Sequence, residues 1–179
     1  FPQPNESRPV LKDALDGLPS PKRARDKNHA NDISELEVAN HEFMYGEFSS
    51  IYMSRNRVRS WDEPSFTIQA GGRHAPIHPQ APKMLDVEKD VKKFAEGEEE
   101  LYRRLSVREC ARIQTFPDNF VFHYDKIAAG YKMIGNAVPV ELARKLAEQI
   151  MADLIQAAAN PMRSQPIIQN AAQQLPLYM

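Results

Sequence analysis

One stretch of the sequence encodes most of the predictable local structure: Arg104-Leu-Ser-Val-Arg-Glu-Cys-Ala-Arg-Ile-Gln-Thr-Phe-Pro117. Ser106 and Glu109 match a helix capping box, in which the Ser106 hydroxyl accepts a hydrogen bond from the Glu109 backbone N–H and the Glu109 carboxylate accepts one from the Ser106 N–H. Leu105 and Cys110 stand at the two ends of a hydrophobic staple. The pattern predicts a helix that ends before the Phe-Pro pair, with Cys110 as a small apolar packing residue.

A second helix is expected near the end of the sequence. Pro139 is the favoured first helical residue, and Glu141 in the first turn suits the helix dipole. An apolar stripe follows at helical spacing and consists of Leu142, Ala143, Leu146, Ala147, Ile150, Met151 and Leu154. The pair Asn160-Pro161 ends the helix, and the Gln- and Pro-rich residues 161–179 are expected to form a flexible tail.

The middle of the sequence has the residue types of β-strands. Two runs are rich in β-formers, Phe48-Ser-Ser-Ile-Tyr-Met-Ser54 and Ser65-Phe-Thr-Ile-Gln-Ala70. Between them lie Arg55, Arg57 and Arg59, which would share one face if the chain is extended, because side chains of a strand alternate at period two. We therefore expect two short strands flanking a basic, extended segment.

Breakers interrupt the chain in two other places. Residues Gly71–Pro82 contain glycines and prolines that exclude a helix or a central strand, so a long surface loop is expected there. The Pro-rich residues 1–31 read as a linker with at most a short helix over Val10–Leu15. Its basic run, residues 22–27, is interpreted as a solvated loop in preference to a phosphate contact. The expected fold class is α+β, a small mixed domain with short strands and long loops.

The composition is that of an ordinary globular protein. With 179 residues the chain fits one domain, or a small domain plus a docking segment. No apolar run is long enough to span a bilayer, and the single cysteine suits a reducing cytoplasm. The net charge of −1 means that any nucleic-acid affinity must come from a local patch.

Two stretches resemble conserved motifs of one enzyme family. Residues 104–120 are similar to the ninth conserved motif of DNA cytosine-5 methyltransferases, R-x-L-T/S-x-R-E-x-A-R-x-Q-x-F-P. The tenth motif, usually Y-x-Q-I-G-N-A-V-P-P, is matched by Tyr131-Lys-Met-Ile-Gly-Asn-Ala-Val-Pro139. The two occur in the family's order, with Met133 where Gln is frequent and Val140 where a second Pro is usual. The chain therefore resembles the C-terminal part of such an enzyme.

The resemblance implies a division of the chain. The family places a variable target-recognition domain before the ninth motif, which here corresponds to residues 32–125 with that motif included. Residues 1–31 would be a linker, and residues 161–179 a flexible tail. Residues 126–160 would hold the tenth motif and a helix that packs on a Rossmann-like catalytic domain.

The resemblance also implies which side chains read the DNA bases. This family extrudes its target cytosine from double-stranded DNA and reads the flanking bases with the small domain. Gly71 and Gly72 would permit close approach of the backbone, and Arg73 is the best candidate for a bidentate contact with guanine. His74 and Gln69 stand beside it as further candidates. The alternative is a glycine turn with a solvated arginine.

Other candidate residues would position the DNA rather than read it. Arg55, Arg57 and Arg59 are interpreted as phosphate contacts, with an exposed basic strand as the alternative. Thr67, with Ile68, resembles the Thr-Leu/Ile/Val pair of otherwise variable recognition domains, where the Thr lies near the backbone of the flipped nucleotide.

The tenth motif implies contact with the methyl donor, S-adenosylmethionine. Gly135, Asn136, Ala137 and Val138 are expected to form a turn that packs on the cofactor-binding domain and borders the cofactor. The alternative is a glycine turn that precedes an amphipathic helix. In the ninth motif, a set of polar residues is expected to organise the small domain; it consists of Arg108, Glu109, Arg112 and Gln114.

Three family motifs are missing from the sequence: the Gly-rich cofactor turn, the Pro-Cys nucleophile and Glu-Asn-Val, whose acid contacts the target base. Attack on cytosine needs an activated thiolate beside that acid, whereas Cys110 follows Glu109 on a capped helix. We therefore expect a fragment or split subunit of a restriction-modification methyltransferase, inactive alone and active with a catalytic polypeptide carrying the first eight motifs.

Two alternatives to a split enzyme remain, a stand-alone sequence-specific DNA-binding module and an inert remnant. The intact tenth motif argues against the first of these. No metal site is expected, because His74, His78 and Cys110 do not have the spacing of zinc ligands.

Overall fold

The computed structural model describes residues 2 and 8–159. It divides into two units, residues 5–141 and residues 1–4 with 142–179, and each unit is described by itself. The first unit mixes helices with short strands, which confirms the expected α+β class. No helix within the described residues is both long and apolar enough to cross a bilayer.

Helix α2 (Val107–Ile113) lies at the centre of the first hydrophobic core. It contacts α1 (Leu11–Leu15), α3 (Ile127–Asn136) and β2 (Glu42–Phe43). The predicted capping box is confirmed, because the Glu109 N–H donates to Ser106 Oγ at 3.0 Å and the Ser106 N–H donates to Glu109 Oε2 at 2.7 Å. The buried members of this core are Leu11, Leu15, Ala24, Ile68, Ala75, Leu105, Val107, Cys110, Ala111, Phe122, Ile127, Tyr131 and Ile134.

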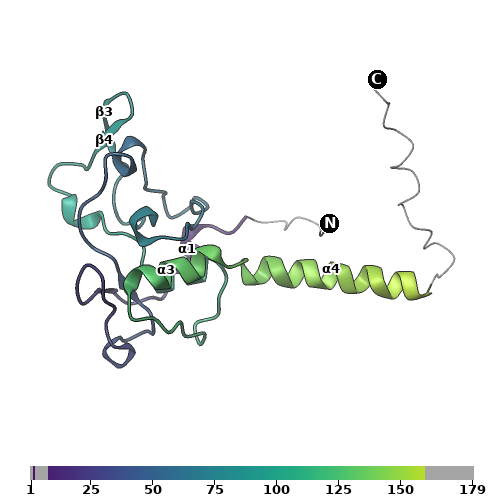
Figure 1. The fold of residues 1–179 in the computed structure, drawn as a ribbon. Helices are drawn as coiled ribbons and strands as arrows, with labels where there is room; N and C mark the ends of the chain where they lie inside the picture. The colour runs from purple at the N-terminus through teal and green to yellow at the C-terminus, as the bar shows by residue number, and fades with distance from the viewer. Residues whose placement is uncertain (1, 3–7, 160–179) are drawn as a thin grey trace, which may run out of the picture. The chain divides into compact units, whose positions relative to one another are not determined.

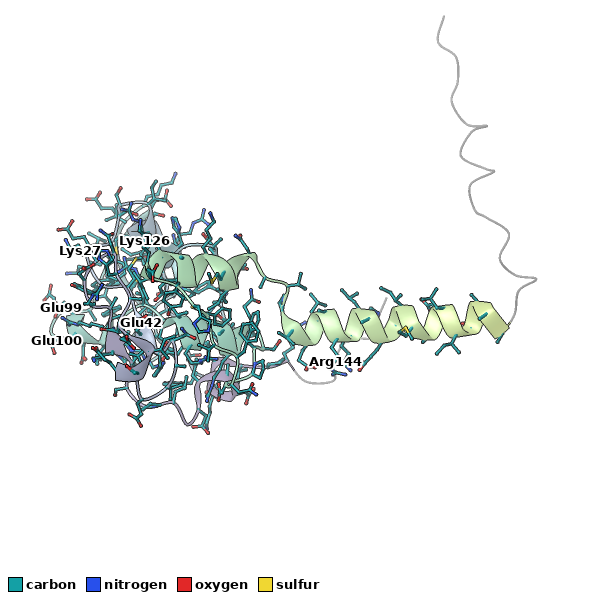
Figure 2. All side chains as sticks on the ribbon, turned by 60° about the horizontal axis from the view of Figure 1, so that its bottom comes forward. Lys27, Glu42, Glu99, Glu100, Lys126 and Arg144 are labelled. Atoms are coloured by element: carbon teal, nitrogen blue, oxygen red, sulfur yellow. The ribbon has the colours of Figure 1, made fainter. Side chains whose placement is uncertain are left out.

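Residues 8–31 belong to the folded unit, which corrects the expectation of a linker. The short helix was expected and is present as α1, whose leucines are buried in the first core. Strand β1 (Lys22–Arg23) pairs in parallel with β2. The Ile127 N–H donates to Asn28 O at 3.1 Å, so the chain near Lys27 lies beside the start of α3 at Lys126 (Figure 2). These backbone bonds and the buried leucines hold the segment in place.

The two strands expected in the middle of the chain are absent. Residues 48–54 end in a 3-10 helix, η2 (Tyr52–Ser54), and residues 65–70 have no regular element. Tyr52 is buried and its hydroxyl donates to Ala75 O at 2.6 Å. Tyr52 belongs to a residue type that is common in strands, but here it packs in a core without forming one. This agrees with the view that β-propensity largely measures burial against neighbouring side chains.

The antiparallel pair lies elsewhere, in β3 (Leu85–Glu88) and β4 (Val91–Lys93), which project from the rest of the unit in Figure 1. A second core underlies this part of the chain and consists of Tyr52, Val58, Ile77, Ala81, Met84 and Tyr102. Three further 3-10 helices are η1 (Ile33–Glu35), η3 (Gly72–His74) and η4 (Glu99–Leu101).

Residues 71–82 are not the surface loop that was expected. Their central part, residues 75–79, is buried, and Ile77 bridges both Val58 and Arg104. The Leu105 N–H donates to Pro76 O at 2.8 Å and the His78 N–H donates to Arg103 O at 2.9 Å. The prolines exclude a regular strand but not isolated bridges, since the residues between them keep their N–H groups. This segment therefore crosses the interior between the two cores.

Two helices carry the tenth-motif region. Helix α3 contains Gly130 and Gly135, whereas the sequence had suggested a turn at Gly135. Helix α4 (Val140–Ala159) begins one residue after Pro139, which had been expected as its first residue, and contains the apolar stripe. The residues predicted to form a tail, 161–179, lie outside the described residues.

Arg108 connects α2 to two other segments of the chain, at Ala39 and at residues 117–120, through backbone carbonyl groups. Its side chain is fully buried, and its Nε donates to Ala39 O at 2.9 Å and its Nη2 to Phe120 O at 2.7 Å. Nη1 adds a longer bond to Pro117 O at 3.3 Å. Burial lowers the pKa of Arg108.

Replacement of Arg108 by methionine is expected to lower the free energy of unfolding by about 2–5 kcal/mol, because part-buried carbonyl groups of Ala39, Pro117 and Phe120 and the buried Asn40 side chain lose their donor. Arg108→Lys should recover only part of the loss, since one ammonium group cannot reach the separated carbonyls. Urea unfolding of the 179-residue chain measures both variants, with the exposed Lys132→Ala as control. An Arg108→Met chain as stable as the control would contradict this role.

Candidate nucleic-acid interface

Arg73 projects from a turn that the backbone holds rigidly. It lies in η3, where the His74 N–H donates to Gly71 O at 3.0 Å and the Ala75 N–H donates to Gly72 O at 3.2 Å. The side chains of Arg73 and His74 are exposed, while Gly72 is buried. The Arg73 guanidinium makes no hydrogen bond or ion pair within the described residues.

The residues that lead into this turn alternate between exposed and buried. Thr67 and Gln69 are exposed, and Ile68 between them is buried in the first core. Thr67 also lies at a shallow cavity of about 340 Å³ formed with residues 9–14 and α2. We call residues 67–74 the exposed segment; it brings together Thr67, Gln69, Gly71, Gly72, Arg73 and His74, all six candidates from this part of the sequence.

The three arginines expected on one strand face have different surroundings. Arg57 Nε donates to Tyr52 O at 2.9 Å, and its guanidinium carbon lies 4.8 Å from the Tyr52 ring centroid. Arg59 pairs with Glu63 at 3.2 Å and lies over the Phe66 ring at 4.3 Å. Only Arg55 is exposed with no such bond among the described residues. Arg57 and Arg59 therefore also stabilise turns of the protein itself. The alternation of side chains along an extended segment could not indicate these contacts.

Ile51 was not identified from the sequence as a surface residue. It is 76% exposed, the highest value for a large hydrophobic side chain among the described residues. Arg57 Nη2 donates to the Ile51 carbonyl at 3.2 Å, so an arginine fixes the backbone that presents this side chain. No pattern in the sequence marked this position, because Ile51 lies in a run that was expected to form a strand.

Arg104 is a further arginine that sequence reasoning did not select. It is almost fully buried, and its guanidinium carbon lies 4.0 Å from the Phe48 ring centroid. Its Nη2 donates to Glu47 O at 3.0 Å. Burial lowers its pKa, and the positive charge of Arg73 contributes in the same direction. Arg104 thus holds the loop before η2, near the exposed Arg73.

A buried ionic network surrounds Glu109 of α2. Glu109 accepts two hydrogen bonds from Arg103, at 2.7 and 2.8 Å, and its Oε1 lies 3.6 Å from His78 Nε2. The Gln80 N–H donates to His78 Nδ1 at 3.2 Å, so the proton of the neutral ring is on Nε2. Burial lowers the pKa of His78 to about 4. The network borders a cavity of about 650 Å³, which Arg23 and Trp61 also line.

The four residues assigned to the cofactor occupy the end of α3 and the residues that follow it. Asn136 and Val138 are exposed, and Ala137 is half-buried. The Ala137 N–H donates to Ile134 O at 3.1 Å and ends the helix. Gly135 is half-buried and lies inside the last helical turn, against the backbone of Gln69 and Ala70. The exposed side chains at this helix end are available to a partner.

Cys110 is completely buried within α2, and burial raises the pKa of its thiol. A thiol in such surroundings is a packing residue and not an activated nucleophile, as predicted from its place in the staple. Across the described ranges, no group of three or more His, Cys, Asp or Glu side chains is arranged to hold a metal ion.

Comparison with known proteins connects this chain to one family. The sequence profile of the C-5 cytosine-specific DNA methylases matches residues 1–152. The Type II methyltransferase M.MthTI of Methanothermobacter thermautotrophicus is 61% identical over 154 residues, which cover 86% of this chain and 46% of that protein. M.FnuDI of Fusobacterium nucleatum is 50% identical over 157 residues, covering 84% of this chain and 44% of that protein.

A third relative, M.BsuRI of Bacillus subtilis, is 48% identical over 133 residues, or 69% of this chain and 30% of that protein. The chain therefore spans less than half the length of each of these Type II methyltransferases.

The lowered pKa of His78 predicts acid sensitivity of the fold. The unfolded chain protonates this ring near the ordinary value of 6.5, whereas the folded chain protonates it only near 4, so acid favours unfolding between these values. Unfolding free energy should fall by about 3 kcal/mol from this residue as the pH drops from 7 to 4. The buried His41, whose pKa is also lowered by burial, acts in the same direction.

Urea unfolding at a series of pH values tests this expectation, with His78→Gln as the comparison. The variant should show a shallower loss of stability between pH 6.5 and 4, since one proton-binding group is removed. Identical pH profiles for the two chains would rule out His78 as the source.

Proposed function

The chain belongs to the C-5 cytosine-specific DNA methylase family, and we propose that it supplies target recognition within a complete enzyme of this family. The observation that carries the proposal is Arg73, an exposed guanidinium that makes no hydrogen bond or ion pair with residues 2 and 8–159 and stands on a backbone held by hydrogen bonds. A rigidly held arginine can place two donors against the O6 and N7 acceptors of guanine in the major groove. Arg73 is accordingly assigned to base readout.

The remaining exposed residues extend this surface. Gln69 and His74 flank Arg73 with side chains that can both donate and accept hydrogen bonds to base edges. Arg55, the exposed member of the arginine group, is assigned to a phosphate. Thr67, at the edge of the 340 Å³ cavity, is assigned to the backbone of the flipped nucleotide.

Arg57 and Arg59 are assigned to phosphate contacts through only some of their N–H groups. Each is half-buried and holds the protein's own backbone or a carboxylate, which leaves some of its N–H groups for DNA. Gly71 would allow the backbone of the exposed segment to approach the duplex closely, whereas Gly72 is buried against the Tyr131 ring.

Methyl transfer itself is assigned to the portion of the enzyme that carries the Gly-rich turn and the Pro-Cys nucleophile. S-adenosylmethionine would supply the methyl group there. The residues after α3 fit an edge contact with this cofactor, because the Asn136 and Val138 side chains are exposed at a helix end and are flanked by the small Ala137. The apolar stripe of α4, none of whose described residues is buried, would pack on the Rossmann-like catalytic domain.

A hybrid enzyme tests the proposal. In it, this chain replaces the portion of M.MthTI that it matches, and methyl transfer from labelled S-adenosylmethionine to duplex DNA is measured. The hybrid is expected to methylate cytosine, whereas the 179-residue chain alone is expected to transfer no methyl group, since its one thiol is buried. Methylation by the chain alone would contradict the assignment.

Arg73→Ala is expected to lower the hybrid's discrimination between its target duplex and duplexes with one substituted base pair by about tenfold to a hundredfold, the effect of one bidentate base contact. The ratio of kcat/KM values for the two duplexes measures this. Arg25→Ala removes an exposed arginine outside the exposed segment and should leave the ratio unchanged. An unchanged ratio for Arg73→Ala would refute base readout by this residue.

A further inference from the structure

Helix α3 touches the exposed segment at a point where no side chain fits. A Cβ atom added to Gly135 would lie under 3.0 Å from the carbonyl carbon and oxygen of Gln69 and from the nitrogen of Ala70. Real Cβ atoms essentially never come so close, and backbone atoms cannot swing aside as a flexible side chain can. The helix and the segment are therefore in direct backbone contact.

A second close contact lies one helical turn away. A Cβ atom added to Gly72 would lie 2.7 Å from one carbon of the Tyr131 ring and 2.9 Å from another. Tyr131 and Gly135 are four residues apart and lie on the same face of α3. The ring is fixed, because the Tyr131 hydroxyl donates to Leu105 O at 2.7 Å and accepts from the Met44 N–H at 3.2 Å.

Neither glycine is required by backbone conformation. The described glycines with positive φ are at other positions, so Gly72 and Gly135 adopt angles that other residues also adopt. What both positions share is the absence of room for a methyl group. Close packing of α3 on the exposed segment accounts for both glycines.

The contact at Gly135 leads directly to Arg73. The Gln69 carbonyl that faces Gly135 accepts a hydrogen bond from the Gly71 N–H at 2.8 Å. The Gly71 carbonyl in turn accepts from the His74 N–H at 3.0 Å, which closes the turn that presents Arg73. Any displacement of the Gln69 peptide therefore shifts the turn and its exposed guanidinium.

We propose that Gly135 is a positioning residue for DNA recognition, with Gly72 as its counterpart in the exposed segment. The bare Cα of Gly135 lets α3 serve as a rigid support for the Gln69–Ala70 peptide, and the position of the helix sets the position of Arg73. The inference rests on the proposed function of the exposed segment. It gives Gly135 a role in sequence selectivity in place of the cofactor contact expected from the motif, because its Cα faces the Gln69–Ala70 backbone.

The two roles of Gly135 predict different kinetic effects. Loss of a cofactor contact raises the KM for S-adenosylmethionine and leaves the choice of DNA sequence alone. Displacement of the Gln69 peptide lowers the discrimination between DNA sequences and leaves the KM for S-adenosylmethionine unchanged. The reason is that the displaced groups contact DNA and not the cofactor, so only the kinetic constants for DNA change.

Gly135→Ala in the hybrid enzyme separates these cases. It is expected to lower discrimination between target and singly substituted duplexes by about tenfold, as for a misplaced base contact, while the KM for S-adenosylmethionine changes by less than about twofold. Lys132→Ala, on an exposed position of the same helix, is the control and should change neither quantity. Unchanged discrimination, or a raised cofactor KM alone, would overturn the inference.

A second measurement covers the case in which the Gly135→Ala enzyme does not fold. Hydrogen exchange of the unaltered 179-residue chain in low urea should show the Gly71 and His74 amides opening with the same free energy as the amides in the last turn of α3, as expected for one cooperative unit. Independent, faster exchange of the segment would overturn the inference.

The proposed function and this inference fail separately. If Arg73→Ala leaves discrimination unchanged, base readout itself fails. If Arg73→Ala lowers discrimination and Gly135→Ala does not, only the positioning role of Gly135 fails.

Discussion

The buried carboxylate of Glu109 is the group on which the architecture of the first unit depends. It caps α2 through Ser106, accepts both hydrogen bonds of the Arg103 guanidinium and faces His78. Burial alone would raise its pKa, but the hydrogen bonds and charge of Arg103 outweigh that effect, and the pKa lies below its ordinary value. A charge of this kind is stable in the interior only when its partners are held in place, so it fixes the segments that supply them.

The network extends from Glu109 to the N-terminal part of the chain. The Ser106 hydroxyl, which caps the helix, also lies 2.9 Å from His41 Nδ1, and His41 Nε2 donates to Pro19 O at 2.8 Å. One short helix therefore connects residues far apart in the sequence. Against its other side packs α3, which supports the exposed segment through glycine contacts. The hydrogen bonds of Glu109 hold α2 in place, and α3 packs against α2. Together they support the segment that presents Arg73.

Local patterns predicted some elements correctly and others wrongly, and the difference has a physical cause. The capping box of α2 and the buried Cys110 depend on residues within one or two turns, and both are present. Helix α4 was expected for the same reason and begins one residue after the expected Pro139. The strand expected at Ser65–Ala70 depends on a pairing partner that the local sequence does not specify, and it is absent. The buried course of residues 75–79 depends on bridges to Val58 and Arg104, which no local pattern indicates.

The sequence by itself determined the family and the capped helix, and it supplied the residues proposed to contact DNA, because these follow from motifs and from side-chain chemistry. Only the tertiary structure decided which of those residues are free. Arg57 and Arg59 are engaged by Tyr52 and Glu63, while Arg73 is exposed on a fixed turn. Likewise, the sequence placed Gly135 in a motif, and the fold placed it against Gln69. Whether a side chain is available depends on distances between residues remote in the chain, and these distances exist only once the cores have packed.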